Sequence, residues 1–258
     1  MSERRVAVIT GAASGVGAAC AEWFARQSFD VLVNYRASEA SARTVVEQCR
    51  TLGADALAVQ GDVAEDTDCR RIAAEAVKRW GRIDVLVNSA GTTLFRSLTD
   101  LDALDLDDFL GIYAVNAVGP YQMTRAVAPH MDAGSAIVNV SSIGGLNGTG
   151  SSYAYAASKG ALNTLTLALA RNLAPDIRVN AVLPGMIEGK WLLEGVGEDA
   201  YNELRNKFAG DAALERVATP AQIAETVGWL AISAELLTGQ LITADAGLLL
   251  GRPPKVLK

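Results

Sequence analysis

The feature that most constrains the fold is a regular alternation of short apolar runs with longer helical patterns. Runs rich in Val, Ile and Leu predict buried strands at residues 5–10, 30–35, 54–60, 83–88, 136–140 and 177–183, with a last strand at 240–244. Helical patterns occupy residues 16–27, 39–52, 66–80, 107–131, 156–173 and 221–232. Strands that alternate with helices form βαβ units with right-handed crossovers. The sequence therefore predicts an α/β fold with one doubly wound, mostly parallel seven-stranded sheet and helices on both faces.

The length and the apolar content allow one domain with a sizeable core. Half of the 258 residues are hydrophobic and a fifth are charged, a size that α/β folds often reach without splitting. We expect one domain over residues 1–251 and a tail at 252–258, either a loose end or a strap onto a neighbouring subunit. Residues 188–215 follow the sixth strand, at the sheet edge where a substrate lid would lie. An ordinary apolar helix pair explains that segment equally well.

The charge balance and the cysteines exclude several classes of protein. A formal net charge of −6 argues against nucleic-acid binding, which normally needs a basic stripe. No apolar segment approaches a membrane span, and the first apolar run is too short for a signal peptide. Cys20, Cys49 and Cys69 lack C-x-x-C spacing and fall in predicted helices, so we expect small buried hydrophobes in a reducing compartment. We predict a cytoplasmic protein without membrane association, and no metal at the solitary His130.

A glycine-rich run joins the first predicted strand to the first predicted helix. It reads Thr10-Gly-Ala-Ala-Ser-Gly-Val-Gly17. Without Cβ atoms the chain can turn tightly, approach a pyrophosphate and direct the first helical N–H groups at negative charge. Any strand-to-helix turn can use glycine, but a strand before and an amphipathic helix after favour a dinucleotide site.

A tyrosine and a lysine further along the chain have the spacing of one helical turn. Tyr155 and Lys159 are four residues apart, so on a helix they share one face. A phenol with a reference pKa near 10 suits an acid, whereas alcohol oxidation needs the phenolate. An ammonium about 4 Å away would supply roughly the 4 kcal/mol needed to lower that pKa by about 3 units, provided that the site is partly closed to water. Tyr153 has Ala157 at the same spacing and is the weaker candidate, while a plain surface pair is the alternative for Tyr155 and Lys159.

Taken together, the motifs resemble the classical branch of the short-chain dehydrogenase/reductase family, whose members share a Rossmann fold. The glycine spacing G-x-x-x-G-x-G is typical of that family, and the resemblance extends from Thr10 to Gly247. The other motifs are Asp62-Val63, Asn88-Ser-Ala-Gly91, Asn116, Val140-Ser-Ser142, Tyr155-Ala-Ala-Ser-Lys159, Asn180 and Pro184-Gly185.

The resemblance implies four catalytic residues. Tyr155 would be the acid and base, and Ser142, 13 residues earlier, would orient the substrate carbonyl. Lys159 would hold the nicotinamide ribose hydroxyls. Asn116 would bend its helix and hold a water that relays protons to Lys159, although a buried polar residue satisfied by backbone is also a plausible interpretation of Asn116. Ser141, next to Ser142, would support the turn or touch the cofactor.

The same resemblance implies a set of cofactor-binding residues. Asp62 would hydrogen-bond the adenine amino group, or would merely cap the following helix, and Val63 would pack on the ring. Residues near 90 would line the adenosine and ribose, and residues near 185 the nicotinamide side. The full set is Gly11, Ser14, Gly15, Val16, Gly17, Tyr35, Arg36, Asp62, Val63, Asn88, Ala90, Gly91, Tyr155, Lys159, Pro184, Gly185 and Ile187.

The end of the second strand indicates which nicotinamide cofactor binds. An NAD site usually places an acid roughly 20 residues past the glycines to hold the ribose 2′-hydroxyl. Here the stretch reads Asn34-Tyr35-Arg36, with no acid before Glu39. Arg36 could pair with a 2′-phosphate, so we predict NADP(H), with NAD(H) possible if Arg36 is only a solvated charge.

These residues predict an NAD(P)-dependent oxidoreductase that interconverts a ketone and a secondary alcohol. The whole-chain pattern is similar to that of 3-oxoacyl carrier-protein reductases, which makes a 3-oxoacyl substrate the first hypothesis. The acidic character of the chain, with Asp132 and Asp176 expected near the rim of the site, argues against an acidic carrier protein. A sugar, polyol or hydroxysteroid substrate, or a non-catalytic NADP(H) sensor, remains an alternative. The resemblance also implies a homotetramer or homodimer.

Overall fold

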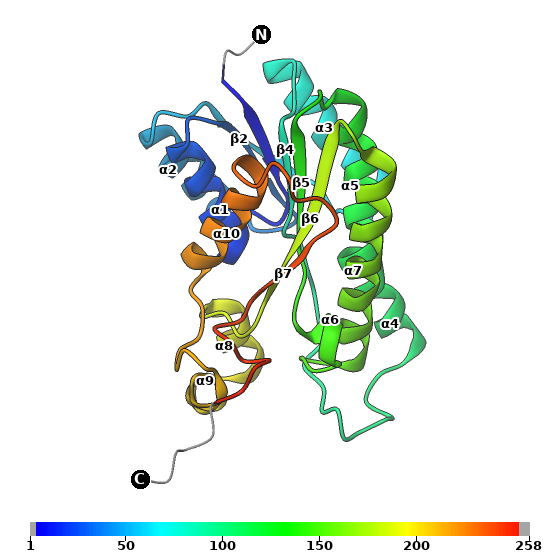
Figure 1. Cartoon of the computed structure of the whole chain (residues 1–258), viewed down its shortest axis with the longest axis vertical. Helices are drawn as coiled ribbons and strands as arrows, with labels where there is room; N and C mark the ends of the chain where they lie inside the picture. The colour runs from blue at the N-terminus through cyan, green and yellow to red at the C-terminus, as the bar shows by residue number, and fades with distance from the viewer. Residues whose placement is uncertain (1–3, 253–258) are drawn as a thin grey trace.

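One parallel sheet organises the computed structural model, which describes residues 4–252. Its seven strands lie in the order β3-β2-β1-β4-β5-β6-β7 (Figure 1). They are β1 (Val6–Ile9), β2 (Asp30–Tyr35), β3 (Ala56–Gln60), β4 (Val85–Asn88), β5 (Ser135–Val140), β6 (Ile177–Pro184) and β7 (Leu241–Ala244). The predicted doubly wound α/β architecture is confirmed, and every strand pair is parallel. The strand order reverses between β1 and β4, and open α/β sheets bind ligands outside the carboxyl ends of the strands at such a point.

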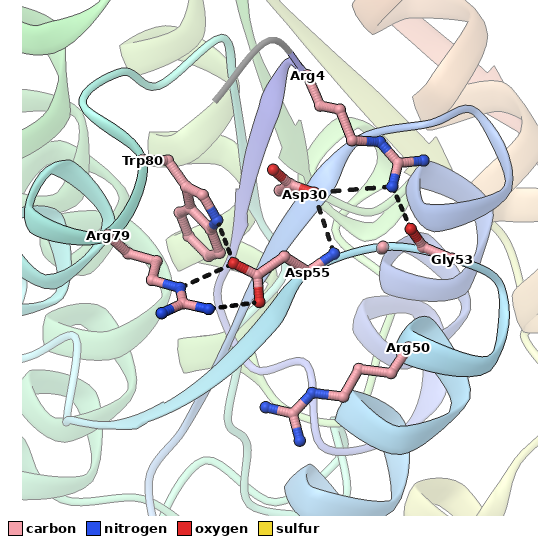
Figure 2. A pocket seen from close by; sticks show the side chains of 8 residues that line it. Arg4, Asp30, Arg50, Gly53, Asp55, Arg79 and Trp80 are labelled. Carbon is pink, nitrogen blue, oxygen red and sulfur yellow. Dashed lines mark hydrogen bonds and ion pairs between the residues drawn. The ribbon is translucent and has the colours of Figure 1, made fainter. Parts of the chain in front are cut away.

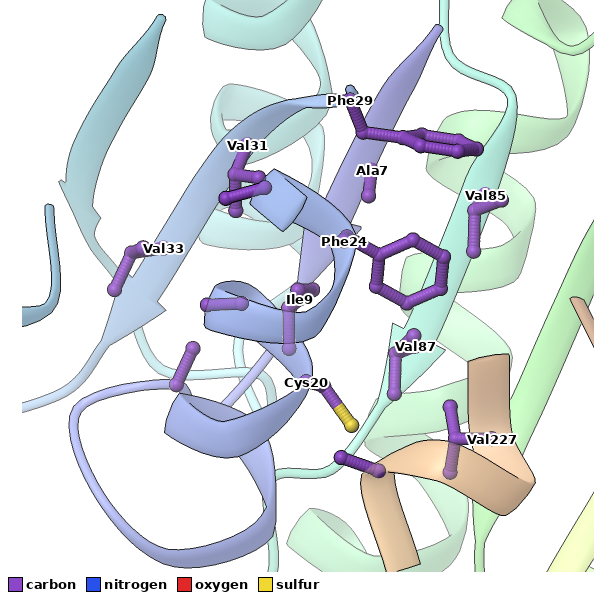
Figure 3. Packing of buried hydrophobic residues seen from close by; sticks show 14 of the residues in the cluster. Ala7, Ile9, Cys20, Phe24, Phe29, Val31, Val33, Val85, Val87 and Val227 are labelled. Atoms are coloured by element: carbon purple, nitrogen blue, oxygen red, sulfur yellow. The ribbon is translucent and has the colours of Figure 1, made fainter. Parts of the chain in front are cut away.

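Helices cover both faces of the sheet and enclose two cores. One face carries α1 (Gly15–Arg26), α2 (Glu39–Thr51) and α10 (Pro220–Ile232), and the other α3 (Asp66–Trp80), α5 (Gly119–Val127) and α7 (Tyr153–Leu173). Because successive strand residues point to opposite faces, Ala7 joins the first core and Val8 the second. Figure 3 shows the first core, where the rings of Phe24 and Phe29 meet edge to face at 5.1 Å.

The long helix predicted at residues 107–131 is present and changes type along its length. It consists of α4 (Leu106–Tyr113), a π-helical turn η1 (Ala114–Val118), α5 and a 3₁₀ turn η2 (Ala128–His130). The π turn is centred on Asn116, whose buried side chain bonds away from the helix, and such a turn interrupts the regular ladder. The prediction of a helical segment at 107–131 is therefore confirmed, and the π turn at Asn116 is a local departure that the periodicity did not indicate.

Two further features lie at the carboxyl edge of the sheet. Helix α7 begins at Tyr153, before the predicted start at 156, because the Ser152 side chain caps it and accepts the N–H of Tyr155 at 3.2 Å. Residues 188–215 contain two helices, α8 (Lys190–Val196) and α9 (Glu198–Asp211), which is compatible with both the helix pair and the lid. The short helix α6 (Gly144–Asn147) follows β5. Residues 253–258 of the predicted tail lie outside the described residues.

At the opposite end of the sheet, where the strands begin, ion pairs join neighbouring segments of the chain. Asp55 accepts both Arg79 nitrogens at 2.8 and 3.0 Å and the Trp80 indole N–H at 2.9 Å, while Asp30 accepts the backbone N–H of Asp55 (Figure 2). Arg4 lies 4.0 Å from Asp30 across the same hollow. These bonds tie the start of β2, the start of β3 and the end of α3 together.

Two acidic residues expected near the rim of the site also lie at this end of the sheet. Asp132 precedes β5 and Asp176 precedes β6, and the Asp176 carbonyl accepts the N–H of Gly134 at 2.9 Å. The expectation that they approach the carboxyl edge was wrong, because both precede their strands instead of following them.

Cys20, Cys49 and Cys69 are buried and free, as the sequence predicts. None of the helices within residues 4–252 combines the length and the apolar character needed to cross a membrane.

Candidate functional site

The glycine turn between β1 and α1 is as tight as its sequence predicts. Gly11 and Gly15 adopt φ values of +61° and +56°, which disfavour residues with side chains. A Cβ on Gly11 would stand 2.7 Å from Cα of Ala90, and a Cβ on Gly17 would stand 2.5 Å from the Gly11 carbonyl oxygen. The turn is thus packed against the loop that follows β4, and only glycine fits at these positions.

The start of α1 suits a negatively charged group. Its N-cap residue, Ser14, makes no side-chain hydrogen bond to the helix, and the first turn, which includes Val16, carries no acidic residue. A Cβ on Gly15 would meet no atom within 4 Å, so the turn borders open space. Helix N-termini present N–H donors and the positive end of the helix dipole. The residues present therefore fit the pyrophosphate of a dinucleotide.

Asn34 is a site residue that the sequence analysis missed. Its buried side chain accepts the N–H of Gly11 at 3.3 Å and donates to the carbonyl groups of Gly61 at 3.0 Å and Val59 at 3.3 Å. Asn34 therefore fixes the glycine turn against the ends of β2 and β3. A lone Asn inside an apolar strand is a signal that could have revealed it, since buried amides are almost always bonded.

The predicted adenosine end lies at the carboxyl ends of β2 and β3. Arg36 follows Tyr35, the buried last residue of β2, and its Nη1 lies 3.7 Å from Oδ2 of Asp62. The Arg36 side chain is 66 % exposed. Asp62 also accepts the N–H of Ala64 at 3.0 Å, which forms a turn before α3. The N-cap residue of α3 is Glu65, so this bond does not cap the helix. Val63 is buried.

The loop after β4 is tied to the glycine turn. The hydroxyl of Thr10 accepts the N–H groups of Ser89 at 3.0 Å and Ala90 at 3.1 Å. Asn88 is buried and donates to Oδ1 of Asn139 on β5 at 2.9 Å. Asn139 is a second buried strand amide that the sequence analysis passed over.

Ser142, Tyr155 and Lys159 come together at the carboxyl end of β5. Ser142 follows β5 and accepts the N–H of Gly144 at 3.0 Å, which leaves its hydroxyl hydrogen available to donate. A hydrogen bond joins the side chains of Ser142 and Tyr155. One turn along α7, the ammonium of Lys159 lies 5.7 Å from the centre of the Tyr155 ring and donates to the Val140 carbonyl at 2.9 Å.

Burial dominates the electrostatics of this group. It lowers the pKa of Lys159 from 10.5 to about 8, because the charged ammonium is removed from water. Burial also raises the pKa of Tyr155 above its ordinary value, and the hydrogen bond with Ser142 opposes that effect. The sequence argument expected Lys159 to lower the pKa of Tyr155. In the structure burial outweighs any such effect, and the phenol is in its acid form at neutral pH.

Asn116 adjoins the same group through Gly91. The Asn116 side chain accepts the N–H of Thr92 at 2.8 Å and donates to the Thr92 carbonyl at 2.9 Å and the Ser158 hydroxyl at 3.0 Å. A Cβ on Gly91 would lie 3.5 Å from Oδ1 of Asn116 and 3.9 Å from Nζ of Lys159, so both groups border one small space. Both interpretations of Asn116 fit, since it is bonded to backbone and lies in the π turn.

Two remaining sets of predicted residues lie at the edge of this group. Pro184 ends β6, Gly185 packs against Asp245, and Ile187 pairs with Ala218 before the chain enters α8. Ser141 donates to Oδ1 of Asn163 at 2.6 Å and is buried, so it supports the turn.

Comparison with known proteins identifies the chain. Residues 11–249 match the family model described as enoyl-(acyl carrier protein) reductase. A chain from Burkholderia xenovorans described as a short-chain dehydrogenase/reductase superposes with a TM-score of 0.90 at 45 % identity, covering 97 % of this chain and 100 % of that one. This chain belongs to the short-chain dehydrogenase/reductase family. It is therefore an NAD(P)-dependent oxidoreductase.

Three other members of the short-chain dehydrogenase/reductase family are similar to this chain over nearly its whole length. Ketoacyl reductase 2 of the granaticin polyketide synthase, from Streptomyces violaceoruber, is 38 % identical over 95 % of this chain and 96 % of its own length. The 3-oxoacyl-[acyl-carrier-protein] reductase of Staphylococcus aureus is 32 % identical over 96 % and 99 %. A blue fluorescent protein from a metagenomic library, solved in complex with NADPH, has a TM-score of 0.85 at 30 % identity over 95 % and 97 %.

Proposed function

We propose that this short-chain dehydrogenase/reductase is an NADP(H)-dependent enzyme that interconverts a ketone and a secondary alcohol. The observation that carries the proposal is the group formed by Ser142, Tyr155 and Lys159, where a phenol in its acid form is bonded to a hydroxyl and adjoins a buried ammonium. A carbonyl oxygen that accepts electrons needs hydrogen-bond donors and one proton. These three side chains can supply both.

Each residue of the group has a separate task in this proposal. A nicotinamide cofactor, when bound, would supply hydride-transfer chemistry at the carbonyl carbon in either direction. Ser142 donates its hydroxyl hydrogen to the carbonyl oxygen and orients it. Tyr155 gives its phenolic proton to the same oxygen, which completes the alcohol. Lys159 then returns a proton to Tyr155, and Asn116 holds the water through which Lys159 recovers its own.

Arg36 supports the preference for NADP(H). Its guanidinium is mostly exposed at the end of β2, where a ribose 2′-phosphate would lie, and no carboxylate precedes it at that position. Arg36 also lies near Asp62, so a phosphate would compete with that carboxylate for the guanidinium. The relative solved in complex with NADPH is consistent with this choice.

The charge of the segment that follows β6 favours a free ketone over one attached to an acidic carrier protein. Helices α8 and α9, with the glycine between them, carry five acidic and three basic side chains. Acidic surfaces repel each other, which weakens docking of an acidic carrier on this side of the site. A 3-oxoacyl thioester remains the second candidate, because two relatives are named for that reaction.

We also propose a homotetramer or homodimer in the cytoplasm. Leu106, Leu110 and Tyr113 are 71 %, 57 % and 45 % exposed and form one apolar stripe along α4. A second copy that covered this stripe would remove it from water, and light scattering on the purified protein would measure the assembly. The three buried thiols suit a reducing compartment.

Reduction of a ketone panel with NADPH and with NADH tests the proposed activity. We expect turnover with NADPH, and a loss of about 10²–10⁴-fold in kcat/KM for Tyr155→Phe with unchanged NADPH affinity. Tyr113→Phe, which alters an exposed tyrosine on α4, is the matched control. A protein that binds NADPH but turns over no ketone, or retains full activity as Tyr155→Phe, would contradict the proposal; the first result would favour a sensor.

A further inference from the structure

An aromatic cluster adjoins the proposed acid and has no task in the reaction described above. It consists of Phe95, Trp191 and the ring of Tyr155. The ring centres of Phe95 and Trp191 are 5.5 Å apart, and those of Trp191 and Tyr155 are 6.4 Å apart, with interplanar angles of 56° and 44°. Trp191 is nevertheless 53 % exposed. A half-exposed indole beside a reacting group leaves apolar surface that a ligand could cover.

Phe95 is the fixed part of this cluster. The loop that carries it is bonded to the segment before α7, with Thr93 Oγ1 2.7 Å from Ser151 Oγ and the N–H of Arg96 donating to the Ser151 carbonyl at 2.8 Å. Tyr153 adds a third bond, from its hydroxyl to the Leu98 carbonyl at 2.5 Å. These bonds therefore fix the position of Phe95 relative to α7, the helix that carries Tyr155.

Trp191 reaches the cluster from α8, and a glycine determines how close that helix can come. A Cβ on Gly195 would stand 2.0 Å from Cε2 of Phe95, which is much closer than van der Waals contact allows. Because Gly195 lies one turn after Trp191, its missing side chain lets α8 rest directly on Phe95 and keeps the indole near Tyr155. Any larger residue at 195 would push α8 away from Phe95.

We propose that Phe95 and Trp191 determine specificity by contacting the planar ring of an aromatic ketone while its carbonyl bonds to Tyr155 and Ser142. This inference rests on the proposed ketone reduction. Ring faces and edges attract each other beyond the area they bury, and tilted arrangements such as these are favourable. A saturated ring of similar size gains only the free energy of burying its apolar surface. The substrate class is therefore a ketone that carries an aromatic ring close to the carbonyl.

The test compares two ketones that differ only in the ring. 1-Phenyl-2-propanone and 1-cyclohexyl-2-propanone have the same unconjugated carbonyl, so the ratio of their kcat/KM values reports ring recognition and not carbonyl reactivity. We expect the ratio to favour the phenyl ketone and to fall about tenfold in Trp191→Leu, the upper range for one aromatic pair. Trp191→Phe should restore most of the ratio. Trp229→Leu, an exposed indole on α10, is the matched control and should leave the ratio unchanged.

A second variant tests how α8 is seated. Gly195→Ala should lower the same ratio and raise KM for the phenyl ketone, while the affinity for NADPH, measured by fluorescence, stays constant. If both ketones are reduced equally well, or if Trp191→Leu lowers both alike, the aromatic specificity is refuted while the proposed reductase activity stands. If neither ketone nor any other member of the panel is reduced, the proposed function fails with it.

Discussion

Replacing Lys159 with methionine should stabilise the protein at neutral pH while abolishing its activity. Lys159 is 5 % exposed, and burial lowers its pKa from 10.5 to about 8. A lowered lysine pKa means that folding disfavours the charged ammonium. Methionine has a similar length and no charge, so Lys159→Met removes this cost.

The size and sign of the effect follow from proton linkage. Below pH 8 the ammonium is charged in both the folded and unfolded chain, and the full cost of about 3 kcal/mol is present. Between pH 8 and 10.5 the folded protein releases its proton first, so the stability of the unaltered chain rises with pH relative to that of the variant. The variant also loses the hydrogen bond from Lys159 to the Val140 carbonyl, which lowers its free energy of unfolding by about 1 kcal/mol. The net gain for Lys159→Met is about 2 kcal/mol at pH 7.

Urea unfolding at pH 7, 8, 9 and 10, at one protein concentration, measures this difference directly. We expect the stability advantage of Lys159→Met to fall by about 2–3 kcal/mol from pH 7 to pH 10. Lys78→Met, an exposed lysine on α3, is the matched control and should show no such trend. A difference between Lys159→Met and the unaltered chain that stays constant across this pH range would refute the reasoning.

Three further predictions concern the cofactor and the fold. Arg36→Glu should lower kcat/KM with NADPH by about 10–100-fold and leave NADH nearly unaffected; equal use of both cofactors by the unaltered chain would argue against the role of Arg36. Gly17→Ala should abolish NADPH binding in a fluorescence titration, because its Cβ would stand 2.5 Å from a carbonyl oxygen, whereas Gly111→Ala, with open space around its Cβ, should bind normally. Hydrogen bonds from Arg79 lower the pKa of Asp55, so Asp55→Asn should cost about 0.5–1 kcal/mol at pH 7, and the cost should disappear as pH falls below 3.8 through the pKa in the folded state. A cost for Asp55→Asn that is unchanged at pH 3 would contradict this assignment.

The sequence predicted the layers of the fold well, because buried parallel strands and amphipathic helices leave strong periodic signals. It also predicted which motifs meet at the carboxyl edge, since parallel strands bring their ends to one side. It failed where a side chain overrides a regular pattern. The π turn at Asn116 depends on bonds to Thr92, far along the chain, and no local periodicity reveals them. The same reason explains Asn34, whose partners are the carbonyl groups of a neighbouring strand.

The pKa shift expected for Tyr155 was wrong for a different reason. The sequence argument counted the charge of Lys159 and assumed a partly closed site, but it could not know that burial would act on both groups at once. Because burial disfavours the phenolate as well as the ammonium, Tyr155 keeps its proton in the resting site. A phenol held in that state is ready to give a proton, which matches ketone reduction. Alcohol oxidation needs the phenolate and therefore additional positive charge at the site, so the pH optimum for oxidation should lie above that for reduction.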